Sequence, residues 1–174
     1  MLNILVPVDG SDNANRAVLH ARQLAQGAAD ARIHLLNIQT PPQGRAGLSR
    51  LVTQEMIDEY YVREGQEAAD EARKLLDVTG TDYTSHVEFG RPAVEIHAYA
   101  QEHRCTRIVM GTRGHGALAG MLIGSVANQV VQLAEVPVAL VRRAATAAAG
   151  HRAAATGRNR CRAPSPAARP RTGG

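Results

Sequence analysis

Apolar and polar positions follow two different periods along residues 1–143. Five short runs are largely apolar or alternate in the manner of β-strands, and they occupy residues 2–8, 33–38, 83–89, 107–110 and 136–141. Apolar residues recur at helical spacing in the stretches between them, which occupy residues 11–27, 48–78, 92–104 and 125–134. Strands joined by helical crossovers form a parallel sheet with helices on both faces. The pattern therefore predicts a doubly wound α/β fold.

Local signals mark where several of these helices begin. Ser11 or Asp12 can cap the first helix, and Pro92 suits the first turn of the third. The second helix, residues 48–78, has one broad apolar side formed by Leu51, Met56, Ile57, Tyr60, Ala68, Ala72, Leu75 and Leu76. Gly65 lies in its interior and is a candidate point for a break, because glycine is a poor helix former.

The charge of the chain is unevenly distributed. The net charge is +4, but residues 144–174 contain six arginines and no acid, so that residues 1–143 carry −2. This last segment consists mainly of Ala, Arg, Pro, Gly, Ser and Thr and cannot bury enough surface to offset the entropy of ordering. We expect a globular domain over residues 1–143 and a disordered tail over residues 144–174. A basic arm can bind nucleic acid nonspecifically, although this one has no aromatic residue to stack on a base.

Several classes of protein are disfavoured by what the sequence lacks. It has no run of about 18 apolar residues and no secretory signal at its start, so we expect a cytoplasmic protein without a membrane span. Cys105 and Cys161 lie far apart and are interpreted as inert thiols. Neither the cysteines nor the histidines have the spacing of metal ligands, and no metal site is predicted.

The first loop of chemical interest is Pro7-Val8-Asp9-Gly10-Ser11, which follows the first strand. In open α/β sheets, ligands bind beyond the carboxyl ends of the strands, where the strand order reverses. Asp9 would lie at the mouth of such a crevice. The alternative is that Asp9 is an ordinary turn or capping residue.

The second loop, residues 111–125, follows the fourth strand and contains five glycines. Glycines allow backbone amides to approach an anion closely, and Ser125 could both bind a phosphate and cap the next helix. A flexible connection is the alternative. The loop is not a Walker A motif, since the only lysine is Lys74, and its glycines do not follow the G-x-G-x-x-G spacing of dinucleotide-binding proteins.

The spacing Gly111-x2-Gly114-x9-Gly124-Ser125 resembles the G-x2-G-x9-G-S/T nucleotide motif of the universal stress protein family. The opening residues 6–11, the step at residues 90–93 and the closing residues 136–138 are also similar to that family. The resemblance covers residues 1–143. It implies a five-stranded sheet of order 3-2-1-4-5, in which the order reverses between the first and fourth strands.

The resemblance also implies a ligand and its binding residues. The ligand is ATP, with ADP or AMP as alternatives, accompanied by Mg²⁺. Residues matching the family's nucleotide contacts are Pro7, Val8 and Asp9 for adenine and ribose, Ile38 and Met110 beside the base, and Gly111, Gly114, Gly124, Ser125 and Val126 for ribose and phosphates. Arg113 and His115 lie in the same loop, where a cation would offset phosphate charge.

No catalytic residue is predicted, because no base or water-positioning group is visible beside these loops. The leading hypothesis is a nucleotide-dependent regulatory module of the stress response. Slow ATP hydrolysis or self-phosphorylation on Ser11, Ser125 or His115 is the enzymatic alternative, and nucleic-acid association through the basic tail is the third. The strand from Val136 to Val141 would form an exposed sheet edge, so we expect a homodimer that pairs two copies through it.

Overall fold

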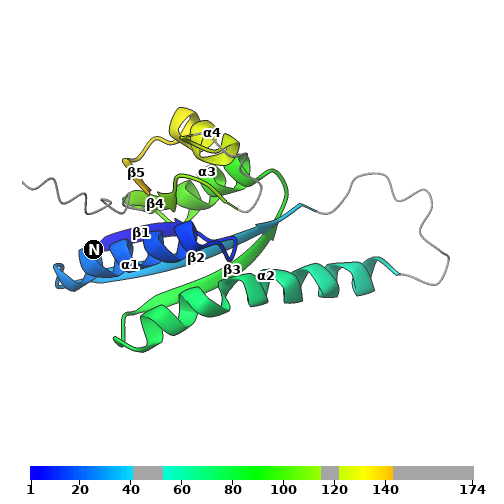
Figure 1. Ribbon diagram of the computed structural model, residues 1–174, viewed down its shortest axis with the longest axis horizontal. Helices are drawn as coiled ribbons and strands as arrows, with labels where there is room; N and C mark the ends of the chain where they lie inside the picture. The colour runs from blue at the N-terminus through cyan, green and yellow to red at the C-terminus, as the bar shows by residue number, and fades with distance from the viewer. Residues whose placement is uncertain (41–52, 115–121, 143–174) are drawn as a thin grey trace, which may run out of the picture. The chain divides into compact units, whose positions relative to one another are not determined.

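The computed structural model describes residues 1–40, 53–114 and 122–142. These residues form a parallel sheet of five strands in the order β3-β2-β1-β4-β5 (Figure 1). The strands are β1 (Leu2–Pro7), β2 (Ala31–Gln39), β3 (Tyr83–Phe89), β4 (Arg107–Gly111) and β5 (Val138–Val141). The predicted strand order is confirmed, and β1 and β4 are neighbours at the point of reversal.

Two helices cover each face of this sheet. The helices are α1 (Asp12–Gln26), α2 (Gln54–Asp77), α3 (Pro92–Glu102) and α4 (Ser125–Leu133). Figure 1 shows α1 and α2 on one side of the strands and α3 and α4 on the other. The predicted α/β class, a doubly wound open sheet of the Rossmann-like type, is therefore confirmed.

The core consists of two apolar layers separated by the sheet. Side chains alternate between the faces of a strand, so Ile33 and Leu35 of β2 pack toward α1 and α2, whereas Leu36 packs toward α3 and α4. The middle of β1 is fully buried, as expected for a central parallel strand. Small residues on α1, such as Ala17 and Ala21, allow that helix to approach the sheet closely.

The second helix differs from its prediction in two respects. It is continuous through Gly65, so no break occurs there. The glycine is needed for packing instead, because a Cβ at this position would lie 2.7 Å from both Asn37 Oδ1 and Val87 Cγ1. Thr53 caps the helix by accepting a hydrogen bond from the Met56 N–H at 3.3 Å. Residues 48–52 of the predicted helix lie outside the described residues.

The predicted apolar side of α2 is buried only over its C-terminal half. Ala69, Ala72 and Leu76 are buried, whereas Met56 and Tyr60 are 54% and 52% exposed. A helix of 24 residues is about 36 Å long, whereas the seven-residue strand β3 spans about 23 Å. The sheet is therefore too short to cover the whole helix. The predicted tail, residues 144–174, also lies outside the described residues.

Candidate functional site

The loops that follow β1 and β4 begin side by side. Because β1 and β4 are adjacent parallel strands, their carboxyl ends lie at the same edge of the sheet. Asp9 follows β1 after one intervening residue, and Gly111 is the last residue of β4. The fold thus brings together the two loops that the sequence identified.

Local hydrogen bonds shape the turn that carries Asp9. The Ser11 N–H donates to Asp9 Oδ1 at 3.1 Å, and Gly10 between them adopts a left-handed φ of +79°. A side chain at Gly10 would be strained in this conformation. Ser11 Oγ in turn accepts from the Ala14 N–H at 3.2 Å and caps α1. Ser11 is therefore the structural cap, and the exposed carboxylate of Asp9 is fixed above the sheet edge.

The segment after β4 is held by contacts to α1, β5 and the start of α4. Thr112 contributes through both backbone groups: its N–H donates to Val141 O at 3.0 Å, and its carbonyl accepts from the Gly124 N–H at 2.7 Å. Asn13 Nδ2 donates to Arg113 O at 3.2 Å. A Cβ at Gly111 would lie 2.8 Å from Asn13 Cβ, so only glycine permits this approach of α1.

A cavity of about 510 Å³ lies between these segments. Every predicted site residue that the structure describes lines it, namely Pro7, Val8, Asp9, Ile38, Met110, Gly111, Arg113, Gly114, Gly124, Ser125 and Val126. His115, the remaining predicted residue, lies outside the described residues. The volume is within the range of about 300–1,000 Å³ found for small-molecule sites.

Five residues that line the cavity were not predicted from the sequence. The additional lining residues are Ala14, Pro92, Ile96, Thr112 and Ala127. Four of them come from the helices α1, α3 and α4, where small or apolar residues also have a core-forming role, so no local signal distinguishes them. Thr112 could have been found, because it stands between predicted residues of the glycine loop.

The cavity combines three kinds of surface. Apolar side chains, including Ile38, Met110 and Ile96, suit a flat apolar group. Asp9 provides hydrogen-bond acceptors, and Arg113 provides a cation. Ser125 begins α4 directly after its cap residue Gly124, and the backbone N–H groups in the first turn of a helix favour an anion. A ligand with an aromatic base, hydroxyl groups and a phosphate would match all three.

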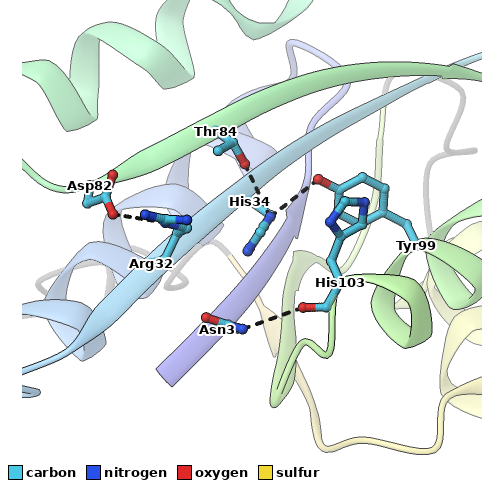
Figure 2. A network of polar contacts seen from close by, with 7 residues as sticks. All are labelled: Asn3, Arg32, His34, Asp82, Thr84, Tyr99 and His103. Carbon is cyan, nitrogen blue, oxygen red and sulfur yellow. Dashed lines mark hydrogen bonds and ion pairs between the residues drawn. The ribbon is translucent and has the colours of Figure 1, made fainter. Parts of the chain in front are cut away.

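A second polar cluster lies between the other end of α3 and the early part of β2 and β3 (Figure 2). His34 is buried, and its Nδ1 is 3.1 Å from Thr84 Oγ1 and 3.3 Å from the Tyr99 hydroxyl. The His103 ring stacks on Tyr99 with centroids 3.9 Å apart, and His86 lies 5.9 Å from His103. None of these residues lines the cavity described above.

Burial is the main cause of the pKa shifts of His34 and Tyr99. Desolvation lowers the pKa of His34, and the charges of His103, His86 and Arg32 lower it further, whereas Asp82 opposes them. Burial also raises the pKa of Tyr99 to about 12. His34 Nε2 is buried and has no hydrogen-bond partner within the described part of the chain. The neutral imidazole is therefore the form that this site favours.

Two features are absent from residues 1–40, 53–114 and 122–142. No helix there combines the length and apolar character needed to cross a membrane. No group of three or more His, Cys, Asp or Glu side chains is arranged to hold a metal ion. The single cysteine in these residues, Cys105, is buried with a free thiol.

Comparison with known proteins agrees with this geometry. The model of the universal stress protein family matches residues 1–142. A universal stress protein of Methanocaldococcus jannaschii is 34% identical over 140 residues, which cover 80% of this chain and 81% of that protein. UspA from Lactobacillus plantarum superposes with a TM-score of 0.66 at 27% identity, covering 81% of this chain and 97% of the other.

A further solved structure, a universal stress protein in complex with cAMP, has a TM-score of 0.56 and 26% identity. The match covers 81% of this chain and 96% of that one. The family predicted from the glycine spacing is thus confirmed by sequence and by structure. This chain belongs to the universal stress protein family.

Proposed function

We propose that this protein binds an adenine nucleotide in the cavity between the loops after β1 and β4. The observation that carries the proposal is the convergence of an apolar wall, the Asp9 carboxylate and the N-terminus of α4 on one cavity of about 510 Å³. The similar universal stress protein solved with cAMP supports an adenine nucleotide as the ligand. ATP is our first candidate, followed by ADP and AMP.

The residues have distinct parts in this proposal. Ile38 and Met110 flank the base, and Asp9 accepts hydrogen bonds from ribose hydroxyls or the base. Gly111, Gly114, Gly124, Ser125 and Val126 contact ribose and phosphates, with Arg113 offsetting phosphate charge. The close approach of α1 at Gly111 and of Asp9 at Gly114 supports the need for glycine in this loop.

Mg²⁺ would accompany a polyphosphate ligand. Magnesium is usually bound through one or two carboxylates together with substrate phosphates. Asp9 is assigned to the ribose or the base, so the ligands of the ion would be phosphate oxygens, water and the hydroxyl of Ser125, which lines the cavity at the start of α4. These ligands suit a metal ion that arrives with the nucleotide. When bound, the ion would neutralise part of the phosphate charge.

We further propose that occupancy of the cavity regulates a cytoplasmic stress response, and that two copies associate through β5. The β5 strand is at the edge of the sheet, and its residues are only half-buried. Val131 and Leu133 of the neighbouring α4 are exposed as well. Unpaired strand edges with apolar neighbours favour pairing with another strand.

Calorimetric titration of the full chain with AMP, ADP and ATP, with and without Mg²⁺, tests the binding proposal. Saturable binding below millimolar concentration is expected, and no heat at millimolar nucleotide would contradict it.

Light scattering tests the proposed dimer. A mass of two chains at micromolar concentration is expected, whereas a mass of one chain would contradict dimerisation.

A further inference from the structure

Val8 is the lining residue at which β1 leaves the sheet, and both of its backbone polar groups are tied to β2. The Val8 N–H donates to Leu36 O at 2.9 Å. The Val8 carbonyl accepts from the side chain of Asn37, whose Nδ2 lies 2.8 Å away. A side-chain amide, one residue beyond Leu36, thus fixes the last peptide before Asp9.

The Asn37 side chain is held in a single orientation. It is 3% exposed, and its Oδ1 accepts from Gln39 Nε2 at 2.7 Å, which directs Nδ2 toward Val8. The α2 backbone passes directly over it, since a Cβ at Gly65 would lie 2.7 Å from Asn37 Oδ1. Water is therefore excluded from the hydrogen bond between Asn37 and Val8. If the Asn37 amide were removed, the buried Val8 carbonyl would have no donor, and its full desolvation penalty would destabilise this conformation.

The constraint at Val8 passes along the chain to the carboxylate of the site. The peptide that joins Val8 to Asp9 is fixed by the Asn37 amide, and Asp9 Oδ1 then accepts from the Ser11 N–H at 3.1 Å. Ser11 is anchored in turn as the cap of α1. Asp9 is thus restrained on both sides: Asn37 holds the peptide before it, and Ser11 holds its carboxylate.

We propose that Asn37 is a positioning residue of the nucleotide site, which acts through the Val8 carbonyl to set the direction of the Asp9 carboxylate. Asn37 does not line the cavity and has no contact of its own to offer a ligand. The proposal rests on the function proposed above. It adds a residue that does not contact the ligand but on which the affinity for the ligand depends.

The test compares Asn37→Leu with the matched control Asn3→Leu. Leucine has nearly the shape of asparagine and removes the amide in both variants. Asn3 lies at the opposite end of the sheet, where its Nδ2 is 3.4 Å from both His103 O and Arg104 O. Two readouts are used: the affinity for AMP, and the hydrogen exchange rate of the Ser11 amide in ligand-free protein relative to that of Val109 in the core.

In Asn37→Leu we expect exchange at Ser11 to accelerate, and the AMP dissociation constant to rise, each by about three- to tenfold, as for the loss of one hydrogen bond. Asn3→Leu should leave both values within a factor of two. If Asn37→Leu does not fold, Gln39→Leu decides the matter, because it frees the orientation of the Asn37 amide and should accelerate Ser11 exchange at least twofold.

The two readouts separate this inference from the proposed function. Wild-type protein that binds no AMP would contradict the function, whereas the Ser11 exchange rate would still decide the role of Asn37. Unchanged exchange at Ser11 in Asn37→Leu, or an equal acceleration in Asn3→Leu, would overturn the inference.

Discussion

Gly114 lies directly against the carboxylate of Asp9. A Cβ built on Gly114 would overlap Asp9 Oδ2, although three of the five strands, β2, β3 and β4, lie between the two residues in the sequence. The contact joins the loop after β4 to the loop after β1 across the mouth of the cavity. Any side chain at position 114 would compete with Asp9 for the same space.

Gly114→Ala should therefore weaken nucleotide binding with only a small loss of stability. The clash falls on the end of an exposed side chain, which can move only by giving up its hydrogen bond from the Ser11 N–H, so we expect the free energy of unfolding to fall by no more than about 1 kcal/mol. Displacement of Asp9 removes hydrogen bonds to the ligand, and the dissociation constant for AMP should rise by about tenfold. Calorimetry and urea denaturation measure the two effects.

Gly27→Ala is the control for that variant, because a Cβ at Gly27 makes only ordinary contacts of 3.6 Å and longer. It should leave the AMP affinity unchanged. Equal affinities for wild type, Gly114→Ala and Gly27→Ala would show that the Asp9 carboxylate has no part in binding.

Gly65→Ala should destabilise the protein, in contrast to its effect on an isolated helix. Alanine improves helix propensity by about 1 kcal/mol. Here the added methyl would lie 2.7 Å from Val87 Cγ1 and from Asn37 Oδ1, and such overpacking costs about 1–3 kcal/mol. A net loss of about 1 kcal/mol is expected in chemical denaturation. Glu67→Ala, at an exposed position of the same helix, should change stability by less than about 0.5 kcal/mol. A gain of stability in Gly65→Ala would contradict the packing described for α2.

Acidification should weaken the fold through His34. Its pKa is lowered in the folded state, so the unfolded chain binds the proton first as the pH falls below the ordinary value of 6.5. The stability contributed by the neutral imidazole is present above that pH and is lost as the pH falls toward the folded-state pKa. Denaturation between pH 7.5 and 5 should show a smaller decline in His34→Gln than in wild type.

His97→Gln is the matched control for the pH experiment, since His97 is a partly exposed residue on α3, the helix that contains Tyr99 and is capped by His103. Its stability should decline with pH as the wild type does. If His34→Gln keeps the full wild-type decline, the pH dependence arises elsewhere.

Arg113→Gln should weaken the binding of ATP more than that of AMP, because ATP carries more phosphate charge. Arg113 lines the cavity, and charge-assisted hydrogen bonds to phosphate are about twice as strong as neutral ones. We expect the ATP dissociation constant to rise by about tenfold and that of AMP by less than about threefold. Arg91→Gln, on an exposed residue outside the cavity lining, should change neither value. Equal losses for ATP and AMP in Arg113→Gln would argue against contact with the outer phosphates.

The hydrophobic pattern was sufficient to predict the fold because parallel strands and their crossover helices leave few arrangements. The order of the strands came from the resemblance carried by Gly111, Gly114, Gly124 and Ser125. That order places Asp9 beside the glycine loop, so most of the cavity wall could be named from the sequence. The ends of the helices and strands were predicted less accurately. The strand β5, for example, begins at Val138, two residues later than predicted.

The parts that the sequence could not reveal depend on packing between distant segments. Ile96 looks like a core residue of α3 and also faces the cavity. Gly65 suggested a break, because its contact with Asn37 is visible only once α2 lies on the sheet. Met56 and Tyr60 follow the helical period but extend beyond the strands that would cover them.

The location of the bound nucleotide is the most direct test of the whole account. In a titration of the full chain with AMP, followed through its backbone amide resonances, we expect saturable shifts at Val8, Asp9, Gly111 and Gly114. The amide of Asn3, at the far end of β1, should not shift. Shifts confined to other surfaces, or no saturable shift at millimolar AMP, would contradict a nucleotide site between the loops after β1 and β4.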